Sequence, residues 1–389
     1  MGGLRRSLRP WTSVVFFAGL AAFAAASDPA FSQSSRTGAA VPNKPELGTT
    51  GERLNANTIA IVSGNLNATY LSIAYDLSAV LDNGDEFRVL PVIGKGGGQN
   101  IKDVRYLKGV DLGITQSVIL NGFRKSNEIG KIDDKIVYIA KLFNEEMHLI
   151  VRAESGITAI DQLAGRKVNF SDVGSGTQLS SRDIFEKLGI QVQEVNVGQA
   201  DAIEQLKSGQ IAATVLIAGK PAGAMARLVA AEGFRILPVP FRKPLQADYL
   251  PSTLSSNDYP RLIEKDQVVE SIAVSAVLIA YNWPKGTDRY RRIQKFVETF
   301  FPKLAEFQKP PRHPKWKEAN LAATLPGWTR FAGADEWLKN NAPKAPSVAE
   351  REQFDRFLQA RSQASGTTAT PADREALFNE FMEWSKTRR

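Results

Sequence analysis

Five short segments rich in Gly, Ser, Thr, Asn and Gln could bind a small anion. The most informative of them, Ser171-Asp-Val-Gly-Ser-Gly-Thr177, lies between an apolar run and a helical pattern. A loop of small residues at that place directs several backbone N–H groups at one point, which suits a carboxylate, phosphate or sulfate. An ordinary helix-capping turn would show the same pattern. The candidate ligand-binding residues of this loop are Gly174, Ser175, Gly176 and Thr177.

Two earlier segments also follow predicted strands. In the first, Asn67 could either cap a helix or bind a ligand. The second has three consecutive glycines, whose entropic cost a plain turn does not require, so it favours a close approach of the backbone to another group. Its spacing fits neither a dinucleotide-binding fingerprint nor a P-loop. The candidates here are Gly64, Asn67, Tyr70, Gly97, Gly98 and Asn100.

The remaining two segments supply polar groups at the ends of further predicted strands. Gln116 follows the strand 112–115, where its amide could contact a ligand or begin a helix. Gly219, Lys220 and Pro221 follow the strand 211–217. Pro221 suits a first helical turn, and Lys220 could either reach an anion or be a solvated surface residue. The shared position of all five segments favours a common cleft.

Catalytic and metal-binding patterns are weak in this sequence. The sequence contains no cysteine, which rules out a thiol nucleophile and a disulfide framework. It contains two histidines. His148 begins an apolar strand and is interpreted as structural, whereas His313 lies in an irregular segment. The adjacent Glu145 and Glu146 would point apart on a strand. We therefore expect a protein that is not an enzyme, with no metal and no cofactor.

Alternating strand and helix patterns predict an α/β fold in two halves. The first series of expected strands is 58–62, 87–93, 112–115 and 136–140; the second is 149–152, 167–170, 193–197, 211–217 and 234–239. Helices are expected at 177–188, 200–207, 221–232 and 288–307, and a long apolar stretch at 268–281. The two halves predict two lobes with a cleft between them, joined by crossing segments at about 145–153 and 265–280. The expected lobes are 57–147 plus 270–310, and 148–269.

Both ends of the chain differ from this pattern. Arginines followed by an apolar stretch and small residues predict a cleavable signal peptide at 1–32, with Ala24-Ala25-Ala26 as a second cleavage candidate. Residues 33–56 are polar and without period, which predicts a flexible linker. The tail 311–389 is rich in Pro and Trp at first and then suggests two helices, so a mostly helical extension is expected. Its Trp residues are expected to pack on a lobe.

The charge of the chain narrows the classes of partner. The formal net charge is +8, and no basic block is present. Such a balance fits an anionic ligand loosely and nucleic acid poorly. Export without cysteine suits the periplasm, so we expect a periplasmic monomer that binds a small anionic solute.

The order of these segments resembles the TAXI family of solute-binding proteins, the extracytoplasmic receptors of TRAP transporters. The resemblance spans about residues 57–310. It rests on seven segments: Gly64 to Tyr70, Gly96 to Asn100, Asp111 to Ser117, Leu149 to Gly156, Leu163 to Val168, Gly174 to Thr177 and Gly219 to Pro221. The chain departs from the family in having Gly where a Ser or Thr is usual in the second segment, and Lys220 where a small neutral residue is usual.

The resemblance implies a type II periplasmic-binding-protein fold that closes on glutamate, a dicarboxylate or an oxo acid and delivers it to TRAP membrane subunits. In that family the loop at Gly174–Thr177 would donate amides to a carboxylate. Asn67, Tyr70, Asn100 and Gln116 would line the opposite wall. Two alternatives remain: a ligand-sensing accessory protein that signals to a membrane kinase, and an exported enzyme on the same fold.

Overall fold

The computed structural model describes residues 47–66, 68–84, 86–341 and 354–355. The predicted signal peptide and the two expected helices of the tail therefore lie outside the described residues, apart from Phe354 and Asp355. The described residues belong to one compact unit. Within the described residues, no helix is long and apolar enough to span a bilayer.

One mixed sheet organises the described chain. Along its main path the strand order is β2-β1-β3-β10-β4-β7-β5-β6, while β8 pairs with β4 and β9 with β10. The strands are β1 Thr58–Val62, β2 Arg88–Val92, β3 Leu112–Gln116, β4 Ile136–Arg152, β5 Lys167–Asn169, β6 Gln193–Val195, β7 Ala213–Ala218, β8 Phe234–Ile236, β9 Leu250–Ser255 and β10 Val268–Tyr281. β1 is parallel to β2 and β3, and β5 is parallel to β6 and β7. This arrangement confirms the α/β fold class.

β4 and β10 are the two longest strands and lie at the centre of the sheet. They pair antiparallel from Ala273–Glu146 to Tyr281–Ile136, with two shifts of register. Both are rich in β-branched apolar residues, which favour a strand that helices bury on both faces. The prediction of separate strands at 136–140 and 149–152 is wrong, because the charged pair between them is buried within one continuous strand.

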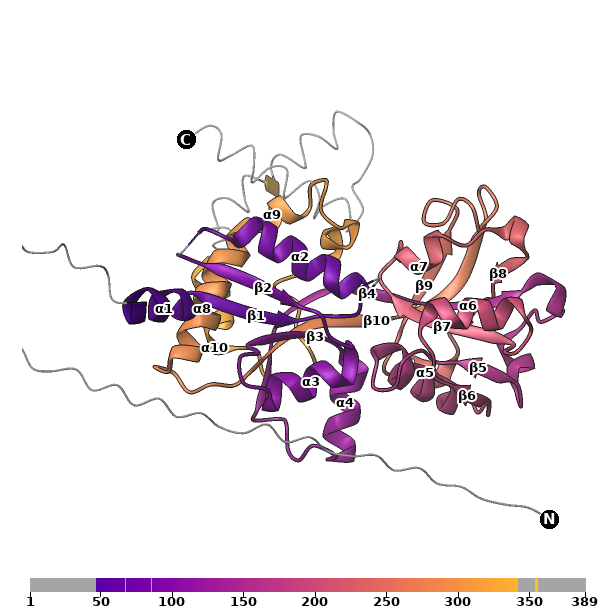
Figure 1. Ribbon diagram of the computed structural model, residues 1–389, viewed down its shortest axis with the longest axis horizontal. Helices are drawn as coiled ribbons and strands as arrows, with labels where there is room; N and C mark the ends of the chain where they lie inside the picture. Colours follow the sequence, from indigo (N-terminus) through magenta and orange to yellow (C-terminus); the bar gives the residue numbers. More distant parts are fainter. Residues whose placement is uncertain (1–46, 67, 85, 342–353, 356–389) are drawn as a thin grey trace, which may run out of the picture. The chain divides into compact units, whose positions relative to one another are not determined.

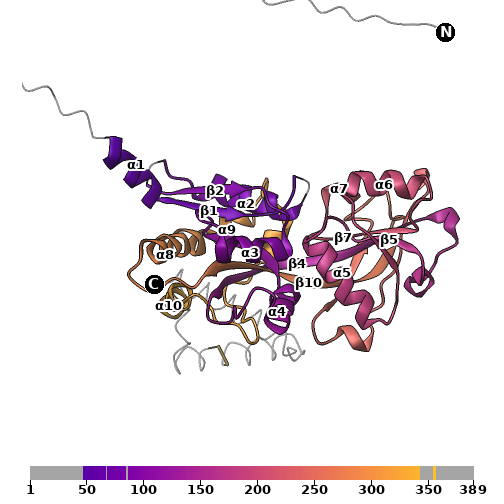
Figure 2. The same cartoon turned by 60° about the horizontal axis from the view of Figure 1, so that its bottom comes forward.

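Figures 1 and 2 show the other elements gathered in two groups, with β4 and β10 extending through both. Lobe 1 denotes β1–β3 with the helices that cover them. These are α2 Thr69–Leu81, α3 Gly97–Tyr106, α4 Ser117–Ser126, α8 Asp288–Phe300, α9 Leu304–Phe307 and α10 Ala332–Asn341. Lobe 2 denotes β5–β9 with α5 Gly176–Lys187, α6 Gln199–Lys207 and α7 Gly223–Ala226. The two-lobed arrangement agrees with the prediction.

Two predicted elements of lobe 2 differ from the structure. The helix expected at 221–232 is reduced to the single turn of α7, followed by a short 3-10 turn at Ala230–Glu232. β9 was not predicted; Pro251 within a run of Ser and Thr hides its strand pattern. Its pairing with β10 is a long-range contact, and the local sequence carries no signal of it.

Apolar side chains form three clusters in the described residues. One lies in lobe 1 and includes Ile73, Phe296 and Trp316. Another lies in lobe 2 around Met225 and Tyr259. The largest cluster runs along β4 and β10 and contains side chains of both lobes. The lobes therefore share apolar packing along these two strands.

The segment before β1 is more ordered than the predicted linker. The segment after α9 packs on the helices of lobe 1. Leu47–Ala56 forms the helix α1, so the prediction of a flexible linker is wrong for these ten residues. After α9, Trp316 is fully buried against Phe300 and Phe307, and Phe331 packs on Tyr290. The expectation that the tail packs on a lobe is confirmed for the described residues up to 341.

Candidate functional site

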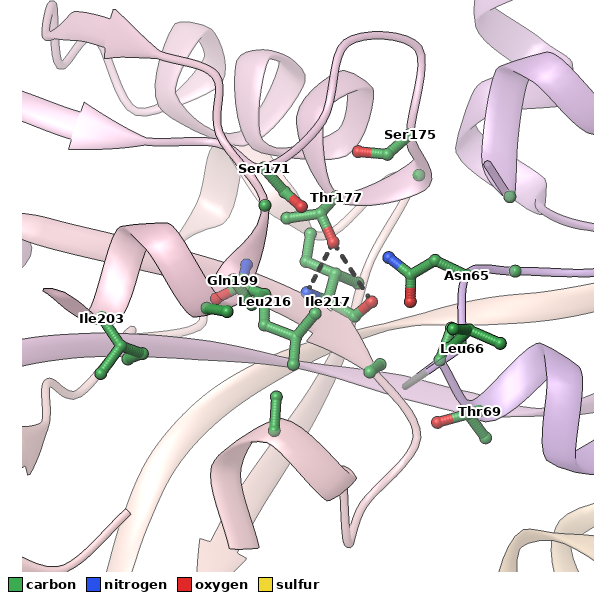
Figure 3. Close-up of a pocket in the computed structure, with 18 of the residues that line it drawn as sticks. Asn65, Leu66, Thr69, Ser171, Ser175, Thr177, Gln199, Ile203, Leu216 and Ile217 are labelled. Atoms are coloured by element: carbon green, nitrogen blue, oxygen red, sulfur yellow. Dashed lines mark hydrogen bonds between the residues drawn. The ribbon is translucent and has the colours of Figure 1, made fainter. Parts of the chain in front are cut away.

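A cavity of about 720 Å³ lies where the two lobes meet. Residues at the start of four helices border it: α2 and α3 from lobe 1, and α5 and α6 from lobe 2. In Figure 3, Asn65, Leu66 and Thr69 approach from one side. Thr177 and Gln199 approach from the other. Because a helix begins with unpaired N–H groups and a partial positive charge, several such ends make the cavity receptive to an anion.

The start of α5 presents the clearest set of donors. Ser175 is the N-cap residue, and its hydroxyl accepts a hydrogen bond from Gln178 N at 3.1 Å. The Thr177 hydroxyl oxygen accepts from Ile217 N at 3.1 Å, which ties α5 to β7 (Figure 3). The amides of Gly176 and Thr177 precede the first intrahelical hydrogen bond and have no partner within the helix.

On the opposite wall, three side chains form a hydrogen-bonded group around a buried carboxylate. Tyr70 Oη donates to Glu145 Oε2 at 2.6 Å, and Gln116 Nε2 donates to the same oxygen at 2.9 Å. Gln116 Oε1 accepts from the hydroxyl of Ser180 in α5 at 2.5 Å. Gln116 therefore fixes the position of Glu145 and contacts lobe 2 at the same time.

Charge in the cavity is divided between an exposed rim and a buried interior. The rim carries exposed side chains of both signs: Lys95, Asp201, Glu204, Lys207, Arg227 and Glu232. Glu145 is 3% exposed and lines the interior. Burial raises its pKa from 4.5 to about 7, although the hydrogen bonds from Tyr70 and Gln116 act in the opposite direction.

Direct contacts join the lobes beside the cavity. Gln99 N donates to Gly174 O at 3.3 Å, and the Thr69 hydroxyl donates to Gly219 O at 3.1 Å. A Cβ placed on Gly97 would lie 2.3 Å from the Cα of Gly176, so these two helix starts touch through their backbones. The consecutive glycines thus allow the other lobe to approach closely.

The structure brings together half of the predicted site residues. Those lining the cavity are Gly64, Tyr70, Gly97, Gln116, Ser175, Gly176 and Thr177. Those outside its lining are Gly98, Asn100, Gly174, Gly219, Lys220 and Pro221. Asn67 lies outside the described residues.

The predicted residues outside the lining have identifiable structural contacts. Asn100 is fully buried, and its Nδ2 donates to the carbonyls of Val62, Ser63 and Ile114, so it ties α3 to β1 and β3. Lys220 Nζ pairs with Asp258 at 3.1 Å instead of extending into the cavity.

The backbone around these residues also serves packing. A Cβ on Gly98 would meet Leu179, and one on Gly219 would meet Lys315 and Thr69. Gly174 adopts a positive φ of 81°, and its amide donates to the side chain of Gln178. Pro221 is exposed and follows a cis peptide bond.

Sequence reasoning passed over several residues that line the cavity, above all Asn65, Glu145 and Gln199. A signal existed for Glu145, since an acidic pair in an apolar strand is unusual unless it has partners. Gln199 is the first residue of α6, so its place at a strand-to-helix junction resembles that of the five predicted segments. Asn65 lies within one of those segments but was not selected.

His148 and Glu146 have the geometry expected of structural groups. His148 Nε2 lies 2.6 Å from Tyr259 Oη and Nδ1 lies 3.2 Å from Leu216 O, and burial lowers the pKa of the ring to about 4. Glu145 and Glu146 do point apart, since Glu146 pairs with Lys315 at 2.6 Å. Among the described residues no group of His, Asp or Glu is arranged to hold a metal ion.

Comparison with known proteins identifies the family. The NMT1-like family model matches residues 61–327, which includes both lobes and the cavity. The chain belongs to the NMT1-like family.

Solved structures that match the chain have low sequence identity and low TM-scores. A periplasmic transporter structure is 14% identical with a TM-score of 0.45, covering 73% of this chain and 92% of the other. The periplasmic aliphatic sulphonate binding protein SsuA from Escherichia coli is 15% identical with a TM-score of 0.39, covering 84% and 83%. Holo ArgBP from T. maritima is 14% identical with a TM-score of 0.40, covering 67% and 95%.

Proposed function

We propose that this NMT1-like protein is a periplasmic receptor that binds a small carboxylate in the cavity between its lobes. The observation that carries the proposal is the start of α5, whose first residues, Gly176 and Thr177, line the cavity together with residues of lobe 1. Fixed N–H groups at a helix start bind a carboxylate without needing a cationic side chain. The exposed charged rim surrounds an interior that apolar residues such as Leu216 and Ile217 also line.

Capture would occur by closure of the two lobes. A ligand held by α5 on one side and by Gln116 on the other gains all its contacts only when the lobes are together, so it stabilises that arrangement. We place the hinge in β4 and β10, within the crossing segments 145–153 and 265–280. The lobes of the proposed receptor are 57–147 plus 270–310, and 148–269.

The partner in this proposal is a set of TRAP transporter membrane subunits, as the family resemblance implies. A receptor that docks on such subunits would need both lobes in their ligand-bound arrangement. Reconstituted membrane subunits should therefore take up the solute only when the receptor is added. Uptake without the receptor would exclude this partnership.

Titration calorimetry with the purified mature protein tests ligand class. The probes are succinate, 2-oxoglutarate, L-glutamate and sulfate, and mass spectrometry identifies any co-purifying solute. We expect at least one carboxylate to bind with a Kd in the micromolar range, and small-angle scattering to report a more compact protein with it. The absence of binding by every carboxylate, or turnover of a bound one, would contradict the proposed function.

A further inference from the structure

Glu145 is a buried carboxylate that the proposed capture of a carboxylate does not use. Its side chain lines the cavity and is 3% exposed. Oε2 accepts from both Tyr70 and Gln116, whereas Oε1 accepts no hydrogen bond from the described part of the chain. An oxygen of a cavity-lining carboxylate that has no donor from the protein can accept a hydrogen bond from a ligand, so a ligand that supplies a donor there would stabilise the site.

No cation of the described chain pairs with Glu145. Lys315, the buried cation nearest in the network, lies 2.6 Å from Glu146 Oε1 and 2.7 Å from Glu318 Oε1. Its ammonium is therefore already paired with two other carboxylates. The cations of the cavity rim are exposed side chains, not buried partners. Glu145 in its ionised form thus has two hydrogen-bond donors and lacks an ion pair.

Gln116 contacts both Glu145 and the start of α5. Gln116 Nε2 lies 2.9 Å from Glu145 Oε2, and the same nitrogen would lie 3.0 Å from a Cβ placed on Gly176. The carboxylate and the first residue of α5 therefore lie next to the same side-chain amide, and both line the cavity. This proximity fits a small ligand that carries both a cationic and an anionic group.

We propose that Glu145 binds a protonated amine of the ligand while the amides of Gly176 and Thr177 bind its carboxylate, so that the ligand is a small amino-carboxylate. This inference rests on the proposed function and narrows its ligand class. It makes Glu145 a specificity-determining residue that rejects carboxylates without the amine. A ligand with a negative group at this place would face the carboxylate of Glu145 at close range.

The ionisation of Glu145 gives the proposal a pH dependence. Because burial raises the pKa of this carboxyl to about 7, its ionised form becomes dominant only above that pH. The groups that face it are Tyr70, Gln116, Glu146 and Lys315. Affinity for an amine-bearing ligand should therefore rise between pH 6 and pH 8, provided that the amine stays protonated.

Matched pairs of probes test the inference on the purified protein. The pairs are L-alanine with propionate, L-aspartate with succinate, and L-glutamate with glutarate; within each pair the amine is present or absent. Calorimetry at pH 8 should give at least one pair in which the amino acid binds tenfold or more tightly. Glu145→Gln should weaken the binding of that amino acid at least tenfold. The affinity for the matched carboxylate without the amine should stay unchanged or increase.

Glu186→Gln is the control, because it removes the same charge from an exposed residue of α5 that does not line the cavity. This variant should change the ratio of the two dissociation constants within each pair of probes by less than threefold. If Glu145→Gln does not fold, Tyr70→Phe provides a second test: it removes a donor to Glu145 and should shift the binding midpoint to higher pH.

Three outcomes distinguish this inference from the proposed receptor function on which it rests. Preference for the amine that disappears in Glu145→Gln supports both. Tight binding of the carboxylates without an amine overturns the inference and leaves the receptor function standing. Failure of every carboxylate to bind overturns both.

Discussion

The hydroxyl of Thr177 shows how a single side chain positions the proposed anion site. Its oxygen accepts from Ile217 N at 3.1 Å, so β7 holds the first turn of α5 against the cavity. The backbone amides that would bind the ligand depend on this bond for their direction. Its loss should therefore affect both stability and affinity.

We predict that Thr177→Val lowers the free energy of unfolding by about 1–3 kcal/mol, because the buried amide of Ile217 loses its acceptor. Ligand affinity should fall by about tenfold, which corresponds to roughly 1.4 kcal/mol. Thr177→Ser keeps the hydroxyl and is the control, expected to remain close to the wild type. Urea denaturation and calorimetry measure the two quantities; equal affinity in all three proteins would contradict the assigned site.

The raised pKa of Glu145 predicts an unusual dependence of protein stability on pH. Its folded pKa is about 7, above its ordinary value of 4.5, so the folded state gains a proton more readily than the unfolded chain. The resulting stabilisation is present below pH 4.5 and is lost as the pH rises through 7. The loss is at most about 3 kcal/mol.

The measurement is the difference in unfolding free energy between the ligand-free wild type and Glu145→Gln. Glu145→Gln has no titrating group at this position, so it should gain stability relative to the wild type between pH 5 and pH 8. A difference that stays constant over this range would show that Glu145 does not titrate there.

At the scale of elements, the meeting of α3 and α5 depends on two glycines. A Cβ on Gly97 would approach Gly176 N within 2.4 Å, and Gly97 itself has a φ of 45°. An alanine there must push the helix starts apart. The proposed closed arrangement therefore requires the small residue at this position.

We predict that Gly97→Ala weakens ligand binding about tenfold or more and makes the ligand-bound protein less compact in small-angle scattering. Gly122→Ala is the matched control, because Gly122 is exposed in α4 and a Cβ there meets nothing within 4 Å. That substitution should be neutral or stabilising by about 0.5–1 kcal/mol. Unaltered binding by Gly97→Ala would mean that the contact plays no part in capture.

At the scale of the whole molecule, the segment after α9 completes the junction between the lobes. Lys315 is 2% exposed and pairs with Glu146 in the central strand β4. Glu146 also accepts from Lys220 N, which belongs to a loop of lobe 2. A residue near the end of the described chain thus neutralises a charge at the junction between the lobes.

We predict that Lys315→Met destabilises the protein by about 3–5 kcal/mol, since Glu146 would be left buried without its cation. The double variant Lys315→Met/Glu146→Gln should recover part of this loss, because the uncompensated charge is removed. Lys317→Met, an exposed neighbour, should change stability by less than about 0.5 kcal/mol. Guanidinium denaturation distinguishes these variants; no recovery in the double variant would refute the charge argument.

The α/β class and the order of strands and helices could be predicted because both depend on local patterns of apolar residues. Strands such as Thr58–Val62 and helices such as Gly176–Lys187 carry their own periodicity and boundary residues. The loop at Gly174–Thr177 could be selected for the same reason. Helix starts after strands are visible in sequence as small polar residues.

The tertiary structure decided which residues far apart in the sequence come into contact. Asn100 matched the pattern of a ligand-binding residue, yet three carbonyls of lobe 1 use its amide. The acidic pair in an apolar strand indicated that Glu145 has partners, but only the antiparallel pairing of two long strands puts it between Tyr70 and Gln116. The sequence by itself determined the elements and the polar loops. Contacts between residues far apart in the chain, which no local periodicity records, decided the composition of the cavity.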